Sequence, residues 1–268
     1  MMDLPPRAAR RRAPCPWLAN AARAAGLGLS LATGAAAGAA PPSPPAPAQD
    51  APWGTQRVLV LKRQAAAYGR VQHAPLPLAP GEVVLSFDDG PSPESTPAVL
   101  AALQAEGAKA VFFMNGAPLL RSPDLGRQVR AQGHAVAMHG HEHLHSSAVS
   151  PQAQLADLAK MEQAFATVFG GPAPAWRYPF LEATPVLDQA LAQRGLTVMS
   201  VDLGIDDWLP DQSPAMLTER LLERLKPLGG GLILMHDAQP QTARALPMML
   251  RAMKAAGYRL VEVRWEAL

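Results

Sequence analysis

The sequence has little of what stabilises disulfide-rich or membrane-embedded proteins. Its 268 residues include one cysteine, Cys15, which excludes an intramolecular disulfide framework and a multi-cysteine metal cluster. No apolar run reaches the roughly 20 residues that a stable transmembrane helix needs, so a polytopic membrane protein is excluded. Aromatic residues make up only 5% of the chain, but the hydrophobic fraction of 49% is too high for a wholly disordered protein.

Excess positive charge is present only at the N-terminus. Residues 1–50 contain five Arg and two Asp, which leaves 19 basic and 20 acidic side chains in residues 51–268, a net charge of −1. The sequence pI of about 8.9 therefore reflects the N-terminal segment. Because no basic stretch follows residue 50, we do not expect a nucleic-acid partner.

Residues 1–40 have the pattern of a secretory signal peptide, with an Arg cluster at 7–12 followed by an apolar stretch at 24–40. A permanent anchor is the second choice, because the stretch is short and has few large aliphatic residues. A disordered Ala/Pro tail is the plainer alternative. Cys15 precedes the apolar stretch, which disfavours a lipoprotein. The proline-rich segment that follows predicts a semi-rigid spacer over residues 41–55. We expect an exported protein, periplasmic or secreted, without stable membrane insertion.

From about residue 83, short apolar runs alternate with helical patterns, which is typical of a parallel sheet covered by helices. The strand-like runs are Val83–Phe87, Lys109–Phe113, Ala135–Met138, Ala175–Arg177, Leu196–Val201, Leu232–Met235 and Arg259–Val263. Helix starts are marked by a hydroxyl residue before proline, at Ser122, Ser150, Thr184 and Ser213. Helix ends are marked by glycine, at Gly107, Gly133, Gly170, Gly195 and Gly257. Seven strands fit either a doubly wound sheet or a closed or nearly closed barrel.

Ionisable side chains collect where these strands end. In parallel α/β folds, functional sites form at the carboxyl ends of the strands. The groups found there are Asp88-Asp89, His139–His145, Arg177–Phe180, Asp202 with Asp206–Trp208, and His236-Asp237. We therefore expect one functional site at this end of the sheet.

Histidine is concentrated in one of these groups. Of the seven histidines in the chain, four lie within residues 139–145. Neutral imidazole is a common ligand of Zn²⁺. His139 and His143 can converge on one ion if the segment turns helically, whereas His141 and His145 would point elsewhere. The plainer interpretation is a solvated histidine-rich loop, which this density of histidine disfavours.

The adjacent carboxylates Asp88 and Asp89 supply the anionic partner for such a site. Neighbouring side chains at a strand end project differently, so one carboxylate can bind a metal ion while the other faces a substrate. Alternatively, the pair caps the next helix in an Asp-Gly-Pro turn. Two imidazoles and one carboxylate leave coordination positions open, which is typical of a catalytic rather than a structural metal site.

In this order, the segments resemble the five motifs of the polysaccharide deacetylase family, which carries the NodB-type homology domain of carbohydrate esterases. The matching segments are Ser86-Phe87-Asp88-Asp89-Gly90-Pro91, His139 with His143, Arg177-Tyr178-Pro179, Asp207-Trp208 and Leu234-Met235-His236. The resemblance covers about residues 80–265. The chain departs from the usual motifs at Gly140, Leu144 and Phe180-Leu181, which we expect to affect substrate shape more than catalysis.

The resemblance implies a role for each matched residue. The implied catalytic residues are the general base Asp88, the general acid His236, and the residues that hold them in position, Arg177 and Asp207. The implied ligands of a divalent metal ion, most simply Zn²⁺ with Co²⁺ and others also suited, are Asp89, His139 and His143. The implied substrate contacts are Pro179, Phe180, whose amide would hold the oxyanion, Trp208, which would form a wall of the acetyl pocket, and Leu234.

The resemblance also implies a fold and an activity. The fold is an irregular (β/α) barrel of seven or eight parallel strands, in a single catalytic domain over residues 81–268. Residues 56–80 are then an N-terminal extension that packs on the barrel. The activity is metal-dependent hydrolysis of carbon–nitrogen bonds, which removes N-acetyl groups from peptidoglycan-like or chitin-like glycans and releases acetate. The expected partner is therefore an acetylated glycan.

Two other classes of protein share parts of this pattern. The segment His139-Gly140-His141 superficially matches the start of barrel metal amidohydrolases that act on small or cyclic amides. The Asp-Asp-Gly-Pro strand end and the late Leu-Met-His segment argue against that class. A non-catalytic exported protein that binds metal or glycan is disfavoured, because the expected acid, base and metal ligands are all present.

Overall fold

The computed structural model describes residues 52–266, which belong to a unit spanning Ala46–Leu268. The predicted signal peptide and most of the predicted spacer lie outside the described residues. The strands are β1 (Thr55–Leu61), β2 (Ala66–Tyr68), β3 (Glu82–Asp88), β4 (Ala110–Met114), β5 (Ala135–Met138), β6 (Ala175–Trp176), β7 (Thr197–Met199), β8 (Leu203–Gly204), β9 (Gly231–His236) and β10 (Arg259–Trp265). The α-helices are α1 (Thr96–Ala105), α2 (Gly116–Arg121), α3 (Pro123–Ala131), α4 (Pro151–Phe169), α5 (Pro185–Gln193), α6 (Pro214–Leu228) and α7 (Pro240–Ala255), and two 3₁₀ turns are η2 (Ser146–Ala148) and η3 (Pro179–Leu181).

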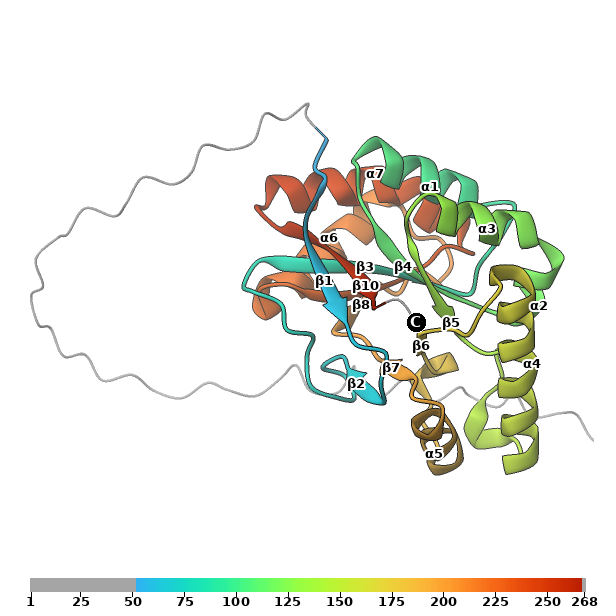
Figure 1. Ribbon diagram of the computed structural model, residues 1–268. Helices are drawn as coiled ribbons and strands as arrows, with labels where there is room; N and C mark the ends of the chain where they lie inside the picture. The colour runs from blue at the N-terminus through green and yellow to red at the C-terminus, as the bar shows by residue number, and fades with distance from the viewer. Residues whose placement is uncertain (1–51, 267–268) are drawn as a thin grey trace, which may run out of the picture. The chain divides into compact units, whose positions relative to one another are not determined.

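The ten strands form one sheet in which every pairing is parallel (Figure 1). Pairing follows chain order from β3 to β7, and β9 and β8 continue the sheet from the other side of β3. Among residues 52–266, no pairing joins β7 to β8. The predicted α/β class and parallel sheet are confirmed, and the seven strands β3 to β9 follow the order of an irregular barrel that is open between β7 and β8.

One strand of the barrel differs from the prediction. The sequence count took Arg259–Val263 as the seventh strand, but β10 pairs with β3 only at Arg259 and Leu260 and continues beside β1. The place in the barrel is taken by β8, which pairs with β9. Because β8 has two residues and β2 has three, neither is long enough to show an alternating pattern.

The N-terminal segment lies across the opening of the barrel. Strand β2 adds to the free edge of β7, and the Val71 amide donates to the Val201 carbonyl over 3.0 Å. The Asp202 carboxylate accepts hydrogen bonds from the amides of Arg70, at 2.7 Å, and Leu232, at 2.9 Å. Asp202 therefore joins the N-terminal segment to the amino end of β9, away from the end that carries His236.

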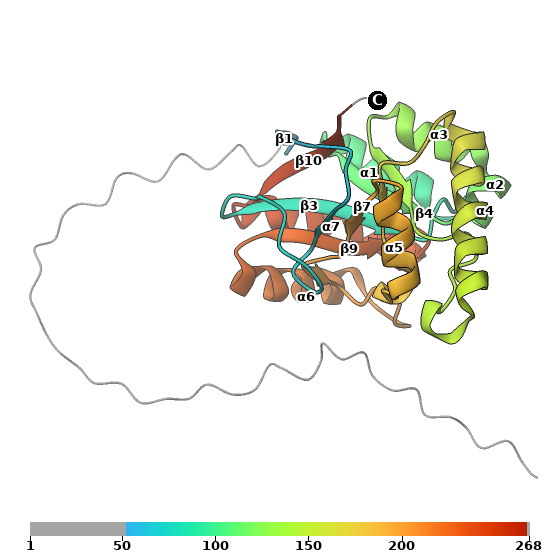
Figure 2. The same cartoon turned by 60° about the horizontal axis from the view of Figure 1, so that its bottom comes forward.

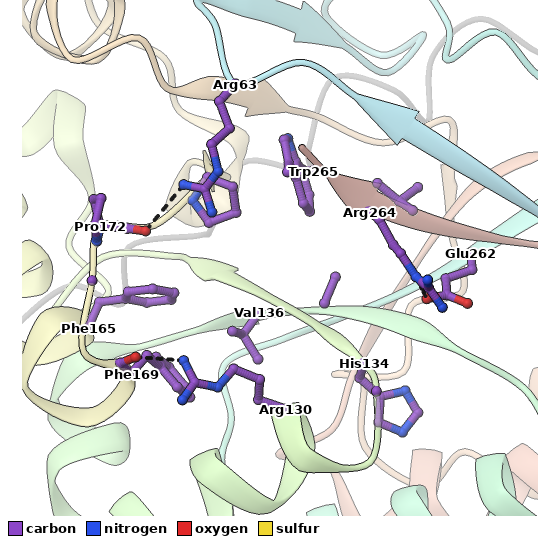
Figure 3. Close-up of a pocket in the computed structure, with 15 residues that line it drawn as sticks. Arg63, Arg130, His134, Val136, Phe165, Phe169, Pro172, Glu262, Arg264 and Trp265 are labelled. Atoms are coloured by element: carbon purple, nitrogen blue, oxygen red, sulfur yellow. Dashed lines mark hydrogen bonds and ion pairs between the residues drawn. The ribbon is translucent and has the colours of Figure 1, made fainter. Parts of the chain in front are cut away.

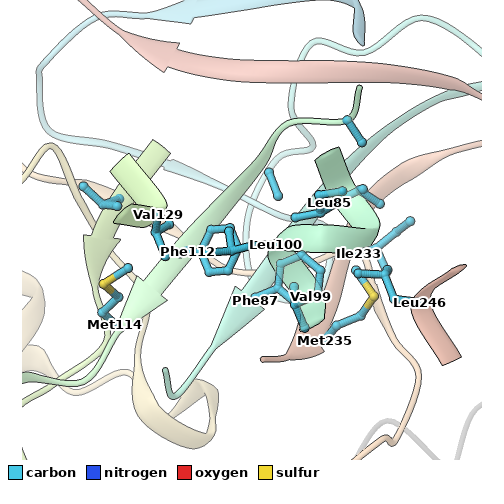
Figure 4. Packing of buried hydrophobic residues seen from close by; sticks show 14 of the residues in the cluster. Leu85, Phe87, Val99, Leu100, Phe112, Met114, Val129, Ile233, Met235 and Leu246 are labelled. Carbon is cyan, nitrogen blue, oxygen red and sulfur yellow. The ribbon is translucent and has the colours of Figure 1, made fainter. Parts of the chain in front are cut away.

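Strand β3 is buried along its whole length and separates two hydrophobic clusters. Leu85 and Phe87 pack in the larger cluster beneath the helices (Figure 4). Val84 belongs to the second cluster, which receives side chains from β3 to β7 and β9 and also from β1 and β10. Because side chains alternate along a strand, Ser86 and Asp88 share the face of Val84 and point into the barrel.

The helices surround the sheet in two groups (Figure 2). Helix α7 packs between α6 and α1, and α4 packs against α2, α3 and α5. Three predicted N-caps are confirmed, since the hydroxyls of Ser150, Thr184 and Ser213 accept a hydrogen bond from an amide three residues on, whereas Ser122 makes no such bond. All five glycines predicted at helix ends have a positive φ. No helix within residues 52–266 is long and apolar enough to cross a membrane.

Candidate functional site

The sheet brings the predicted site residues together at one end. Asp88 and His236 are register partners at the last positions of β3 and β9. His139 directly follows β5, and Arg177 directly follows β6, at the point where these two strands pair. Parallel strands that start and end in register place their carboxyl ends side by side, so residues far apart in the sequence meet here.

Asp89, His139 and His143 form a group that could hold a metal ion, with one ligand atom of each within 4.8 Å of the others. Oδ1 of Asp89 lies 3.2 Å from Nε2 of His143 and 3.6 Å from Nε2 of His139. Two imidazole nitrogens and a carboxylate oxygen suit a divalent cation, and three protein ligands leave coordination positions open. The donor set therefore fits the metal ion expected from the sequence.

Burial keeps His139 in the neutral form that binds metals. The residue is 2% exposed, and burial lowers the pKa of its imidazole to about 3. Nδ1 lies 3.0 Å from the carbonyl oxygen of Arg177, and an acceptor at this position assigns the proton to Nδ1. The lone pair is then on Nε2, the atom that faces Asp89. A backbone acceptor of this kind orients a metal-binding imidazole.

The segment between His139 and His143 is not helical, whereas the sequence prediction made their convergence depend on a helical turn. His143 itself has a left-handed backbone, with a φ of 52°. Gly140 has a φ of 104°, which L side chains rarely adopt, so glycine suits this position. Asp157 on α4 accepts hydrogen bonds from the amides of His141 and Glu142, both at 2.9 Å. His139 and His143 therefore converge through an irregular turn anchored on α4.

Asp88 is buried inside the barrel beside Arg177. Nη1 of Arg177 donates to Oδ1 of Asp88 over 2.7 Å and to the Ser86 hydroxyl over 2.9 Å. The rest of the guanidinium donates to the carbonyl oxygens of Met199 and Ser200. Burial raises the pKa of Asp88, and the charge of Arg177 opposes this rise. The carboxylate is therefore fixed in orientation and has a higher proton affinity than an exposed aspartate.

His236 is held by Asp207, which is itself buried. Nδ1 of His236 lies 2.7 Å from Oδ1 of Asp207, and the His236 amide donates to Oδ2 over 2.7 Å. Gln241 and Thr242, at the start of α7, also donate hydrogen bonds to Asp207. Burial lowers the pKa of His236, but the charge and hydrogen bond of Asp207 outweigh it and raise the value to about 9. The imidazole is therefore protonated at neutral pH.

Two exposed aromatic side chains stand beside these groups. The Trp208 ring is 43% exposed and lies edge-on to His236, with ring centroids 5.8 Å apart. Phe180 is 47% exposed, and its ring centroid lies 4.3 Å from that of His143. Pro179 is buried and Leu234 is partly buried. One aromatic ring thus lies beside the predicted acid and the other beside a predicted metal ligand.

The other members of the histidine cluster point elsewhere, as the sequence predicted. Nδ1 of His141 pairs with Glu142 at 3.0 Å. His145 pairs with Glu182 at 2.9 Å and stacks on Phe180, with ring centroids 3.5 Å apart. Neither histidine belongs to the group that could hold a metal ion.

Sequence reasoning assigned no role to four buried polar residues that contact this site. Asn115 donates from Nδ2 to Oδ1 of Asp89 over 3.2 Å, and Asp237 accepts a hydrogen bond from the Gly90 amide over 3.2 Å. Asp237 belongs to the strand-end group His236-Asp237 of the sequence analysis, and Asn115 also follows directly after a strand, so the same signal could have identified it. Asp157 and Thr242 lie within helices, where no local pattern distinguishes them from ordinary polar residues.

A cavity of about 400 Å³ lies elsewhere, near the amino ends of β5 and β6, and contains none of the predicted site residues (Figure 3). Its walls include Phe165, Trp265 and the side chains of Arg63 and Arg130. These two guanidinium groups donate to backbone carbonyl oxygens of the wall itself. The chemistry described above is therefore separate from this cavity.

Comparison with known proteins agrees with the fold. Residues 77–199 match the family described as polysaccharide deacetylase. A peptidoglycan-N-acetylglucosamine deacetylase of Listeria monocytogenes is 28% identical over 204 residues, which are 76% of this chain and 42% of that protein. A chitin deacetylase of Colletotrichum lindemuthianum is 27% identical over 195 residues, 69% of this chain and 78% of that protein. The solved structure of a peptidoglycan deacetylase of Bdellovibrio bacteriovorus has a TM-score of 0.72 at 27% identity, over 81% of this chain and 61% of that one.

The match to the polysaccharide deacetylase family thus covers residues 77–199, slightly less than half of the chain, and the solved deacetylase structure shares the fold over 81% of the chain. The match spans less than half of the Listeria protein, at 42% of its length, so the likeness to that relative is confined to the matched part.

Proposed function

We propose that this protein is a metal-dependent hydrolase that removes N-acetyl groups from amino-sugar polysaccharides or oligosaccharides and releases acetate. The observation that carries this proposal is an acid and a base beside one candidate metal group. Oδ2 of Asp88 lies 3.6 Å from Nε2 of His139, and Asp88 and His236 are register partners. Amide hydrolysis needs a water to lose a proton and the departing amine to gain one. The names of the bacterial and fungal relatives support a glycan of N-acetylglucosamine as substrate.

Asp89, His139 and His143 would hold the metal ion, most simply Zn²⁺, with Co²⁺ also suited to this donor set. When bound, such an ion polarises a carbonyl oxygen and lowers the pKa of water. The neutral state of His139 supports this role, because a protonated imidazole cannot bind a metal.

Asp88 accepts a proton from the attacking water. Burial raises its pKa, which brings its proton affinity closer to that of an efficient base near neutral pH. Arg177 keeps the carboxylate of Asp88 from rotating. Its Nη1 donates a hydrogen bond to Oδ1 of Asp88 and is itself held by a second bond to the Ser86 hydroxyl. The second carboxylate oxygen is left to face the reacting water.

His236 donates a proton to the amine nitrogen as the carbon–nitrogen bond breaks. Its Nδ1 is engaged with Asp207, so the proton that it gives is on Nε2. Asp207 favours the protonated ring and fixes its direction. The hydrogen bonds from Gln241 and Thr242 hold Asp207 in turn.

The Phe180 amide is the proposed donor to the oxyanion. In other enzymes, removal of one such donor raises the activation free energy by roughly 3–4 kcal/mol. Phe180 has a φ of 55°, and the buried ring of Pro179 precedes it, which fixes the direction of that amide. Trp208 and Leu234 would line the space for the acetyl methyl group.

We further propose that the protein works outside the cytoplasm, in the periplasm or as a secreted enzyme. The signal-like pattern of residues 1–40 and the cell-wall glycans named for its bacterial relatives support this location.

A screen for acetate release tests the proposed activity. The substrates are N-acetylglucosamine oligomers, peptidoglycan, O-acetylated xylan and small cyclic amides, each with and without a chelator. We expect acetate from the N-acetylated glycans, loss of release with chelator, and recovery with Zn²⁺ or Co²⁺. Hydrolysis of cyclic amides alone, measured by the appearance of the ring-opened amino acid because no acetate is formed, would indicate another kind of amidohydrolase. One equivalent of bound metal without acetate from any glycan would indicate a non-catalytic binding protein.

A further inference from the structure

We propose that Asn115 and Asp237 are positioning residues that clamp the Asp89-Gly90 turn from its two sides and so set the affinity of the metal site. The inference rests on the metal site of the proposed function. Strand β3, which leads into the turn, lies between β4 and β9. Asn115 directly follows β4 and Asp237 directly follows β9, so the two side chains approach the turn from opposite neighbours.

The turn has a backbone conformation that needs support. Asp89 has a φ of 76°, in the left-handed region that a residue with a Cβ atom rarely adopts. Such conformations persist where the surrounding structure holds them, and they occur often at functional sites. The ligand carboxylate of Asp89 can therefore be directed toward His139 and His143 only while the neighbouring peptide is held.

Asn115 holds the first side of the turn. Its backbone amide donates to the Gly90 carbonyl over 3.1 Å, and its Nδ2 donates to Oδ1 of Asp89 over 3.2 Å. The residue is 6% exposed, and its side-chain oxygen has no hydrogen-bond partner among the described residues. Burying an unpaired amide oxygen is unfavourable, so the bond to Asp89 is the polar contact that accounts for this side chain.

Asp237 holds the second side. Its Oδ1 accepts the Gly90 amide over 3.2 Å, Thr96 donates its hydroxyl to Oδ2, and the residue is 1% exposed. The contact is so close that a Cβ atom added to Gly90 would clash with the carboxylate of Asp237. The amide and the carbonyl of Gly90 are thus both bound, one to each flanking strand, and the orientation of the preceding residue is fixed.

Metal affinity of the full-length chain tests the clamp without relying on turnover. Co²⁺ is titrated into metal-free protein and followed by its visible absorption, with Asp89→Ala defining the signal of this site. We expect Asn115→Ala and Asp237→Ala to weaken binding by about 10–100-fold, as removal of partners that orient metal ligands does elsewhere. Asp237→Asn retains an oxygen acceptor for the Gly90 amide, so we expect affinity close to that of the unmodified chain.

The conservative variant separates the clamp from a charge effect. If Asp237 acted only through its negative charge, Asp237→Asn would bind as weakly as Asp237→Ala, and the clamp would be wrong. Asp202→Ala is the matched control, because Asp202 also accepts two backbone amides but joins other segments. It should lower the melting temperature and leave Co²⁺ affinity unchanged.

Two results overturn the inference directly. One is unchanged Co²⁺ affinity in both Asn115→Ala and Asp237→Ala, and the other is unchanged affinity in Asp89→Ala. If Asp237→Ala does not fold, the clamp is still tested by Asn115→Ala, which should bind Co²⁺ more weakly, and by Asp237→Asn, which should bind it almost normally. Because binding is measured apart from acetate release, a chain that binds Co²⁺ as expected but releases no acetate refutes the proposed function and leaves the clamp standing.

Discussion

Two buried pairs at the sheet end control where protons reside. Arg177 contacts Asp88 at 2.7 Å, and Asp207 contacts His236 at the same distance. In the first pair, burial raises the pKa of the carboxyl group in spite of the guanidinium. In the second, Asp207 raises the pKa of the imidazole to about 9 in spite of burial. Asp88 is therefore suited to accept a proton and His236 to give one, a division of roles typical of acid–base sites.

Replacement of the proposed base should stop turnover without emptying the metal site. We expect Asp88→Asn to lower kcat for acetate release by about 10²–10⁴-fold, the usual contribution of a general base. Metal content should stay near that of the unmodified chain, because Asp88 is not among the three grouped ligands. Asp124→Asn, at a side chain that is 98% exposed, serves as the control. Unchanged turnover in Asp88→Asn would mean that another group takes the proton.

Replacement of Asp207 should shift the pH dependence through His236. A group with a raised pKa stays protonated until the pH rises through that value, so activity that needs the acid falls on the alkaline side. Removal of the Asp207 charge in Asp207→Asn leaves the lowering effect of burial, and we expect the alkaline limb of kcat/KM to move down by about 1–3 pH units. The charges of Asp88 and Asp89 also raise the pKa of His236. A bound cation would oppose this rise equally in the unmodified chain and in Asp207→Asn, so the comparison is matched. An unmoved limb would exclude His236 as the acid.

At the scale of elements, the sequence predicted what depends on local pattern. The buried run of β3 and the period of two place Asp88 inside the barrel, and the other strand ends carry the matched motifs. Three features depend on distant contacts and could not be read locally. Strand β10 leaves β3 for β1, the segment from His139 to His143 turns without a helix, and Asp157 reaches that segment from α4.

Asp157 is expected to hold the histidine ligands through the backbone between them. In Asp157→Ala, the amides of His141 and Glu142 lose their shared acceptor, and the left-handed turn at His143 loses its anchor. We expect metal affinity about 10-fold weaker, measured by Co²⁺ titration. Glu162→Ala tests the same helix at an exposed ion pair with Arg194 and should bind as the unmodified chain does. Equal affinities for the two variants would show that the turn does not need Asp157.

At the scale of the whole described unit, segments distant in sequence extend the sheet at the opening of the barrel. Strand β2 and the turn after it bridge the opening beside β7, and β1 pairs with β10. The sequence predicted that residues 56–80 pack on the barrel, but not which strands they pair with, because β1 and β2 precede the residues 80–265 that the resemblance covers. Chain segments outside the motif-bearing part thus contribute to a barrel that the motif-bearing strands leave open.

The stability of this unit should depend on pH through His134, which directly precedes β5 and contacts the start of β4. The residue is 4% exposed, its Nδ1 accepts the Ala110 amide over 3.3 Å, and its ring lies edge-on to Phe112. Burial, with a smaller effect of Lys109, lowers its pKa to about 4 from 6.5. Between these values the unfolded chain binds more protons than the folded one, so the free energy of unfolding falls as the pH falls.

The contribution of His134 can be isolated with a variant that does not titrate. His134→Gln keeps an acceptor for the Ala110 amide, and urea unfolding of both proteins is measured from pH 7.5 to pH 4.5. Because each unit of pKa difference corresponds to about 1.4 kcal/mol, we expect the unmodified chain to lose about 3 kcal/mol more than the variant over this range. Any excess in the free energy of unfolding of the unmodified chain over His134→Gln at pH 7.5 should therefore shrink or reverse at pH 4.5. Parallel stability curves would mean that His134 does not limit the fold in acid, and that the loss comes from other buried groups.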